Sequence, residues 1–390
     1  MENTKKKSKA GRITGRILLI VLALILIAAL AVGIVWHNEI KTIASIKQLA
    51  PADETHRDCA VYTFNVAGGY YFDEFLEQGG SPSVDGTVSY LVRNITKGLF
   101  KMNLSTPGAG CTCFTAATSD GDRIMARNYD FSETNSAIVF TDPGRGRHAS
   151  VSSVDLQFIS VKPDSDLSPF VNKVLALAAP YVPMDGMNDA GVACGILMSY
   201  QEGSTQQNTD RPDLIASAMM RLVLDYADDL DEAVELVKSY DMHDTLGLSF
   251  HYFIADSSGR SAVLEYVGGG RTSKDDDPDS RELIVTWNDG PDYQLLTNYV
   301  IYPDYYSEGD ELHGQNRFEI AGEYLDKCGS VVKDENEAMD ILRSVGRRLL
   351  QDSPGVTVHS VVYNLTDCSV TWVSNEHYGE DAYTFRYSLR

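Results

Sequence analysis

A cysteine, an arginine and an aspartate stand at a spacing that could bring their side chains together. Arg127 and Asp130 follow Cys111 by sixteen and nineteen residues, and Asp120-Gly121-Asp122 lies between them. Glycine tolerates a positive φ, so this segment is typical of a β-hairpin with its turn at Gly121. A hairpin places the start of its first strand beside the end of its second. We therefore expect Cys111 to lie close to Arg127 and Asp130.

This arrangement suits nucleophilic chemistry at Cys111. A neighbouring guanidinium stabilises the thiolate and so lowers the pKa of the thiol, and the thiolate is the nucleophile. A carboxylate a few ångströms away could hold an ammonium group or orient a base. Gly108, Ala109 and Gly110 precede the cysteine, where small residues allow a strained peptide bond to be placed. One short segment thus contains a nucleophile, its activator and a cleavable bond.

The same residues also have structural interpretations. Cysteine is most often a small buried core residue. Arg127 and Asp130 could form a cross-strand ion pair, which contributes little to stability when exposed. Cys113 points to the same face of its strand as Cys111, and we interpret it as a packing residue. Spacing alone leaves both interpretations of Cys111 open.

The order of the motifs resembles the choloylglycine hydrolase, or linear amide C–N hydrolase, family of N-terminal nucleophile enzymes. In that family Cys-Thr opens the mature chain, and an Asp-Gly turn and Arg-Asn-x-Asp follow. The matching segments here are Cys111-Thr112, Asp120-Gly121 and Arg127-Asn128-Tyr129-Asp130. Further segments that resemble family motifs are 185–191, Leu296-Thr297-Asn298, Asn316-Arg317-Phe318 and 360–366. The resemblance extends from Cys111 to about Tyr387.

The resemblance implies roles for five residues. Cys111 would be the nucleophile, Arg127 would border its thiol, and Asp130 would bond the amino group of the nucleophile. Asn298 would donate its amide NH₂ to the oxyanion, and Arg317 would belong to the charge network of the active site. Without the resemblance, Asn298 could be only a turn residue and Arg317 only a residue on a helix surface.

Three other residues are of interest. Met198 stands where many bile-salt hydrolases have an asparagine, so one oxyanion donor is missing or a backbone N–H replaces it. A thioether at that point favours an apolar acyl side of the substrate site. The sequence matches no acid partner to His251, and Asp185 falls in a turn motif. We interpret both as structural.

An internal cysteine has no free α-amine, which the family mechanism uses as general base. An α-amino pKa of about 8 suits proton transfer near neutral pH. The prediction is therefore an amidase that is cleaved at Gly110–Cys111 and then hydrolyses a linear, non-peptide C–N bond. A small acyl amide would form an acyl-enzyme on Cys111, with no metal or organic cofactor. An acyltransferase with the same acyl-enzyme and an inactive tethered binding protein are the alternatives.

The amino-terminal segment indicates a membrane anchor. Residues 17–36 are uncharged, and as a helix they would span roughly 30 Å, the hydrocarbon thickness of a bilayer. Six basic residues lie within residues 1–16, which places this flank in the cytoplasm and the rest of the chain outside the cell. A cleaved signal peptide is the competing interpretation, although its apolar core usually has about 7–15 residues.

Composition excludes some partners. The chain has 390 residues, with 55 Asp and Glu against 33 Lys and Arg, a net charge of −22. Such a balance argues against nucleic acid, because binding phosphates requires a basic surface. The six cysteines show none of the paired spacings that bind zinc. With 43% hydrophobic residues, the chain can bury one large core or two ordinary ones.

After Cys111, strand-like runs alternate with a few helices. We expect these helices over 168–178, 211–226, 230–239, 317–325 and 336–349. Antiparallel strands with helical blocks between them favour two sheets packed face to face with helices outside. The resemblance implies the same α+β fold, a four-layer αββα sandwich, here preceded by a single N-terminal transmembrane helix. The expected parts are a basic tail (1–16), the anchor (17–36), a folded pre-segment (37–110) and the hydrolase domain (111–390).

Overall fold

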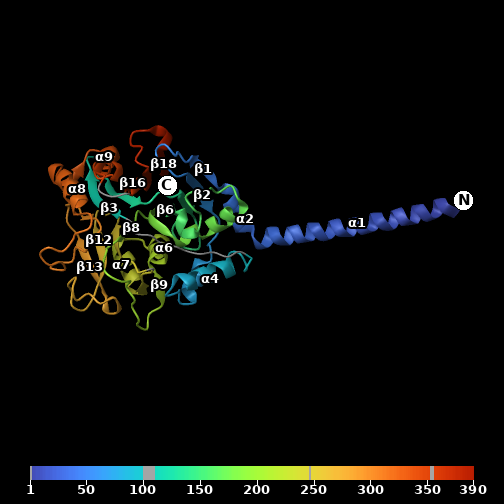
Figure 1. The fold of residues 1–390 in the computed structure, drawn as a ribbon, viewed down its shortest axis with the longest axis horizontal. Helices are drawn as coiled ribbons and strands as arrows, with labels where there is room; N and C mark the ends of the chain where they lie inside the picture. The colour runs from blue at the N-terminus through green and yellow to red at the C-terminus, as the bar shows by residue number, and fades with distance from the viewer. Residues whose placement is uncertain (1, 100–109, 246, 352–354) are drawn as a thin grey trace.

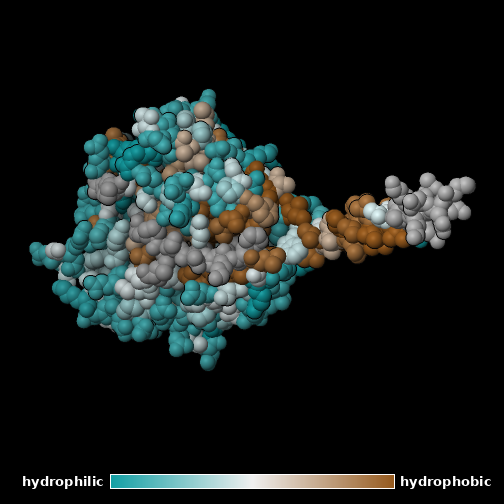
Figure 2. Space-filling view, turned by 45° about the vertical axis from the view of Figure 1, so that its right-hand side comes forward, coloured by the Kyte–Doolittle hydropathy of each residue, from teal (hydrophilic) through white to brown (hydrophobic). Residues whose placement is uncertain are grey.

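The computed structural model describes residues 2–99, 110–245, 247–351 and 355–390. Helix α1 (Glu2–Val35) extends away from the rest of the molecule (Figure 1). Its stretch Ile13–Val35 is long and apolar enough to cross a membrane, a test that a signal sequence also passes. Figure 2 shows the apolar surface of this helix beside a largely hydrophilic body. Gly108 and Ala109, which we expect to flank the cleaved bond, lie outside the described residues.

The larger sheet has nine strands in the described chain, in the order β1-β2-β5-β6-β7-β8-β11-β12-β13. Their bounds are Lys47–Ala50, Val61–Val66, Ser136–Thr141, Ser150–Asp155, Pro183–Asn188, Ala193–Met198, Phe250–Ala255, Ser261–Val267 and Glu282–Asn288. The pairs are antiparallel except β2 with β5, which run parallel. Strands β5 to β8 are almost wholly buried. This sheet is therefore covered on both faces.

The second sheet has seven strands among the described residues, in the order β14-β3-β4-β16-β17-β18 with β15 beside β3. Their bounds are Leu295–Leu296, Gly110–Thr118, Arg123–Phe131, Val356–Asn364, Ser369–Ser374, Thr384–Ser388 and Val331–Val332. Strand β3 faces β8 of the larger sheet, and both are buried along their whole length. A separate parallel pair joins β9 (Asp213–Ile215) to β10 (Asp241–His243).

Helices cover the outer faces of both sheets (Figure 1). Helix α6 (Ala216–Tyr226) packs on β7 and β8, and α7 (Leu230–Lys238) packs on α6 and β11. Helices α8 (Gln315–Lys327) and α9 (Glu335–Ser344) pack on the second sheet. The order helix, sheet, sheet, helix is the four-layer α+β sandwich that the sequence predicts.

Three of the expected helices differ from the observed ones in their bounds or continuity. The segment expected to be helical from residue 211 first forms β9, because Asp213–Ile215 pairs with β10, and α6 starts at Ala216. The helix expected over 336–349 breaks into α9 and a short α10 (Arg347–Leu350). The helix expected over 168–178 is α5 (Phe170–Leu175) followed by the 3₁₀ helix η2 (Ala176–Tyr181).

The pre-segment shares the core of the hydrolase part. It contributes α2 (His37–Ser45), β1, β2, α3 (Phe72–Glu77) and α4 (Val84–Asn94). Strand β2 adds to the larger sheet through β5, and the Tyr70 hydroxyl donates to Asp225 of α6 at 2.6 Å. Phe72 and Phe75 are fully buried against the ring of Tyr181. Residues 37–99 therefore fold together with the chain after Cys111.

A truncation in this shared core should destabilise the whole molecule. Leu91 of α4 is 1% exposed, so Leu91→Ala should lower the free energy of unfolding by about 2–5 kcal/mol through lost burial and a cavity. Leu99 in the same segment is 70% exposed, and Leu99→Ala should change it by less than about 0.5 kcal/mol. Urea unfolding of the detergent-solubilised chain, followed by tryptophan fluorescence, measures both. Equal small effects would mean that the pre-segment is not part of the cooperative core.

Candidate active site

The predicted hairpin is strands β3 and β4. They pair antiparallel, with Gly110 opposite Asp130 and Cys111 opposite Tyr129. The connecting turn has Gly121 at φ +93°, a conformation that favours glycine. Every residue of β3 is buried. The hairpin therefore places Cys111 at the buried end of a strand, beside the end of β4.

Arg127 contacts the thiol of Cys111, as the spacing predicts. Its Nη2 donates to the Sγ of Cys111 at 3.3 Å, although Cys113 is the residue directly opposite Arg127 in the register. The predicted fall in the pKa of Cys111 is nevertheless wrong in this uncleaved chain. Burial raises the pKa of the thiol, and Arg127 only partly opposes that rise, because Cys111 is 1% exposed.

Arg127 is held by the larger sheet although it belongs to the smaller one. Its Nη1 donates to the carboxylate of Asp185 and to the carbonyl of Met184, and its Nη2 donates to the carbonyl of Ile196. Gly195 leaves room for the arginine, since a Cβ there would lie 3.2 Å from its Cδ. A fully buried guanidinium requires such partners. The position of Arg127 beside the thiol is thus fixed from three directions.

Asp185 is the counter-ion of Arg127 and not only a turn residue. It lies within β7, and the turn itself falls after Asn188, with Gly191 at φ +85°. Besides Arg127, its carboxylate binds His359 Nε2 at 2.9 Å and accepts from the Tyr363 hydroxyl at 2.6 Å. Burial alone would raise the pKa of Asp185, but His359 and Arg127 outweigh it and lower the pKa. No local pattern indicates this pairing, because the partners are more than fifty residues apart.

Asn298 lies against the backbone of Cys111. Its Oδ1 accepts from the Cys111 N–H and from Arg317 Nη2, both at 2.7 Å. Its Nδ2 donates to the carbonyl of Met198 at 2.9 Å. In this chain the amide oxygen of Asn298 therefore faces the backbone of Cys111, while one hydrogen of the NH₂ that the resemblance assigns to the oxyanion bonds the carbonyl of Met198.

Arg317 and Asp130 meet on the other side of Cys111. Arg317 Nη1 donates to the Cys111 carbonyl and, at 2.8 Å, to the Thr112 hydroxyl, and it lies 3.3 Å from Asp130 Oδ2. The Cys111 nitrogen is a peptide nitrogen with a single hydrogen, which Asn298 accepts. The contact between Asp130 and a free amino group that the resemblance implies would therefore require the cleaved chain. All five predicted site residues lie together and are buried.

Sequence reasoning missed Arg347, the second cation at Asp130. Its Nε lies 3.0 Å from Asp130 Oδ2, and the Thr357 hydroxyl donates to Asp130 Oδ1 at 2.7 Å. Asp130 thus sits between two guanidinium groups and a hydroxyl. No motif marks Arg347, because it approaches the site from a short helix more than two hundred residues after Asp130.

His251 has an acid partner, contrary to the prediction. Its Nδ1 lies 3.1 Å from Glu265 Oε1, and its Nε2 lies 3.0 Å from the carbonyl of Thr297. Glu265 also accepts from the Ile301 N–H at 2.8 Å. The ring therefore supports the segment that carries Asn298. This is a structural role, as predicted, although the ring has an acid partner that the sequence did not indicate.

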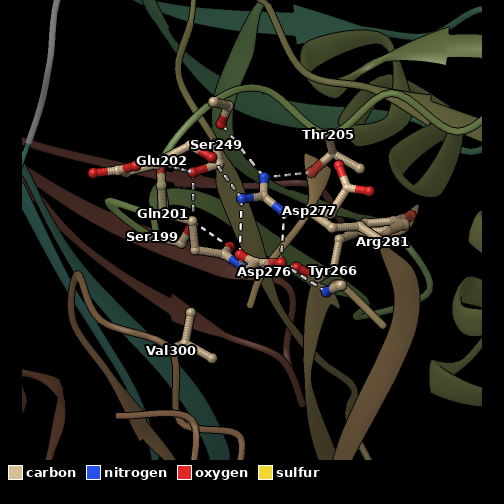
Figure 3. A network of polar contacts seen from close by, with 12 residues as sticks. Ser199, Gln201, Glu202, Thr205, Ser249, Tyr266, Asp276, Asp277, Arg281 and Val300 are labelled. Atoms are coloured by element: carbon tan, nitrogen blue, oxygen red, sulfur yellow. Dashed lines mark hydrogen bonds and ion pairs between the residues drawn. The ribbon is translucent and has the colours of Figure 1, made fainter. Parts of the chain in front are cut away.

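A polar network holds the segment that follows Met198. Ser199 donates to Gln201, Gln201 Nε2 donates to Asp276 Oδ2 at 2.8 Å, and Arg281 Nη2 binds the same oxygen at 2.8 Å (Figure 3). Tyr200 in this segment has φ +54° and stacks on His313 with ring centroids 4.1 Å apart. Burial raises the pKa of Tyr200.

Among the described residues, no group of three or more His, Cys, Asp or Glu side chains could hold a metal ion. The site instead consists of a thiol, an amide, two carboxylates and three guanidinium groups. Such a set can activate a nucleophile and hold a carbonyl compound, which is the chemistry of acyl transfer.

Comparison with known proteins agrees with this chemistry. Residues 111–303 match the family described as linear amide C–N hydrolases, choloylglycine hydrolase family, and the chain belongs to that family. Two variants of the conjugated bile acid hydrolase from Clostridium perfringens share its fold at 16% and 17% identity. Each has a TM-score of 0.50 and covers 72% of this chain and 92% of its own. Penicillin V acylase from Agrobacterium tumefaciens is 20% identical over 72% of this chain and 86% of its own, with a TM-score of 0.47. A search of curated proteins found no match.

The contact between Arg127 and Cys111 can be tested by alkylation. Arg127→Met removes the cation that opposes the effect of burial, so the pKa of Cys111 should rise further. The midpoint of iodoacetamide labelling at Cys111, resolved by peptide mass, should then move to higher pH. Arg123→Met at the other end of β4 is the control and should leave the midpoint unchanged. An unshifted midpoint in a folded Arg127→Met protein would show that the arginine does not tune the thiol.

Proposed function

We propose that this chain is a membrane-anchored cysteine amidase that is cleaved between Gly110 and Cys111 and then hydrolyses a linear, non-peptide amide. The observation that carries the proposal is the 3.3 Å contact from Arg127 Nη2 to Cys111 Sγ. It occurs in a chain whose family acts on linear amide C–N bonds. Asn298, Arg317 and Asp130 surround the same cysteine and supply donors, acceptors and charge.

Cleavage begins when the Sγ of Cys111 attacks the carbonyl carbon of Gly110. The S–C bond forms, the C–N bond to Cys111 breaks, and the thiol proton ends on the Cys111 nitrogen. Water then hydrolyses the thioester, which leaves a carboxylate on Gly110 and restores the thiol. The product is a free α-amine on Cys111, whose ordinary pKa of about 8 suits a general base. Asn298 Oδ1, already an acceptor for this nitrogen, would hold the amine.

Turnover would repeat this chemistry on a substrate. The amine takes the thiol proton, the thiolate attacks the substrate carbonyl, and the leaving amine departs with that proton. Water then releases the acid from Cys111. The Asn298 NH₂ has two hydrogens, one of which bonds the carbonyl of Met198, so in our proposal the other hydrogen and backbone N–H groups bond the oxyanion. Buried Met198 beside Asn298 favours an apolar acyl group.

Substitution of the two neighbouring cysteines tests the nucleophile. Cys111→Ala should stay uncleaved by intact mass and should not hydrolyse a panel of conjugated bile acid, penicillin V and N-acylethanolamine. Cys113→Ala, two residues along the same strand, should be cleaved and retain hydrolysis of whichever amide the native chain accepts. Added amine acceptors separate hydrolysis from acyl transfer. Turnover by Cys111→Ala, or by native protein with an intact Gly110–Cys111 bond, would overturn the mechanism.

We also assign α1 as an uncleaved anchor that keeps the basic amino terminus in the cytoplasm and the catalytic part outside the cell. Its base is tied to the body, because Trp36 Nε1 donates to the Ile95 carbonyl at 3.1 Å. The strand pairing between β2 and β5 would hold the fragment after Cys111 once the bond is cut.

Membrane fractionation tests this assignment. After cleavage, the 111–390 fragment should sediment with membranes and survive a high-salt wash, because apolar burial and sheet hydrogen bonds are not screened by salt. Concentrated urea should release it while the anchor fragment stays in the pellet. A chain without residues 1–36 should be found in the soluble fraction. A soluble native protein that begins shortly after Trp36 would instead identify α1 as a signal peptide.

A further inference from the structure

Arg347 is tied to Asp130 at two points. Its Nε lies 3.0 Å from Asp130 Oδ2, and its backbone N–H donates to the Thr357 hydroxyl at 3.0 Å. That hydroxyl donates to the other oxygen of Asp130 at 2.7 Å. The side chain of Arg347 is 10% exposed. The guanidinium is therefore held in one place and is not a mobile surface charge.

This guanidinium lies directly against Gly110. A Cβ at residue 110 would stand 1.8 Å from Arg347 Nη2, 2.9 Å from its Cζ and 3.3 Å from its Nε. Gly110 is not among the glycines with positive φ, so its backbone conformation does not require glycine. It is the close approach of the Arg347 guanidinium that favours glycine at this position. A side chain at this position would therefore have to displace the end of the Arg347 side chain.

We propose that Arg347 is a positioning residue for the cleavage of the Gly110–Cys111 bond. This inference rests on the proposed function, because it concerns the cleavage assigned there. Attack by a thiolate requires its sulfur within about 3–3.5 Å of an aligned carbonyl carbon. Glycine is the most flexible residue and has no side chain to fix it. Arg347 supplies the missing constraint, since it packs on Gly110 while Asp130, opposite Gly110 in the register, fixes the arginine.

The alternative is that Arg347 only neutralises Asp130. Arg317 lies 3.3 Å from the same oxygen, so Asp130 has a second cation. Arg347→Lys distinguishes the two roles, because an ammonium can pair with Asp130 but offers no planar group over Gly110. A positioning role predicts that Arg347→Lys is cleaved as slowly as Arg347→Ala. A charge role predicts that the lysine restores the native rate, which would overturn the proposal.

A double-mutant cycle with Gly110→Ala tests the contact itself. Arg347→Ala and Gly110→Ala should each slow cleavage at least tenfold, the first by releasing Gly110 and the second by displacing the guanidinium. The double variant should be cleaved within twofold of the slower single variant, because both changes remove one contact. Independent effects that multiply to about a hundredfold would show that the two residues do not act together, and would overturn the proposal.

The measurement is the rate at which full-length chain yields a fragment starting at Cys111, by pulse labelling and intact mass. Arg348→Ala is the matched control, because the neighbouring arginine on the same helix binds Asp58 at 2.7 Å and does not face Gly110. It should be cleaved within twofold of the native rate, and the melting temperatures of all variants confirm folding. Native cleavage with an equal rate in Arg347→Ala would overturn this inference alone. Absence of cleavage in the native chain would overturn the proposed function.

Discussion

A buried ion pair links the two sheets beside Cys111. Arg127 belongs to β4 of the smaller sheet and Asp185 to β7 of the larger one, and neither side chain is exposed. Removing one partner of such a pair typically costs about 3–5 kcal/mol, because the other charge is left buried and unpaired. The same arginine thus contacts Asp185 of the larger sheet and the thiol of Cys111. A change at Arg127 is therefore expected to affect both stability and the site.

The same burial affects the thiol of Cys111. In the uncleaved chain burial raises the pKa of this thiol, and Arg127 opposes part of that rise. Any opening that hydrates Cys111 would remove the cost of burial and leave Arg127 in place. The pKa would then fall, which is the direction that the spacing to Arg127 predicts. Changes in the pKa of Cys111 would therefore follow the access of water to the thiol, because Arg127 stays in place.

Sequence reasoning succeeded where the signal is local. The Gly121 turn predicts the hairpin, and the hairpin predicts the contact between Cys111 and Arg127. It failed where the partner comes from a distant strand or helix, as for Asp185 with Arg127 and for Arg347 with Asp130. The family resemblance brought Asn298 and Arg317 to the site but not the direction of the Asn298 amide. The direction of the amide depends on its hydrogen bond to the carbonyl of Met198, and residue spacing in the sequence does not predict this bond.

The proposed cut falls inside β3, between its first residue and its second. Strands β1 and β2, which precede the bond, belong to the larger sheet, and that sheet is completed after the bond by β5 to β8 and β11 to β13. Breaking Gly110–Cys111 would therefore remove a covalent link between two parts that already share a core. Their separation would have to expose the apolar contacts of Phe72 and Leu91, at roughly 25 cal/mol per Å². Cleavage can thus free an amine at the nucleophile without freeing the enzyme from its amino-terminal helix.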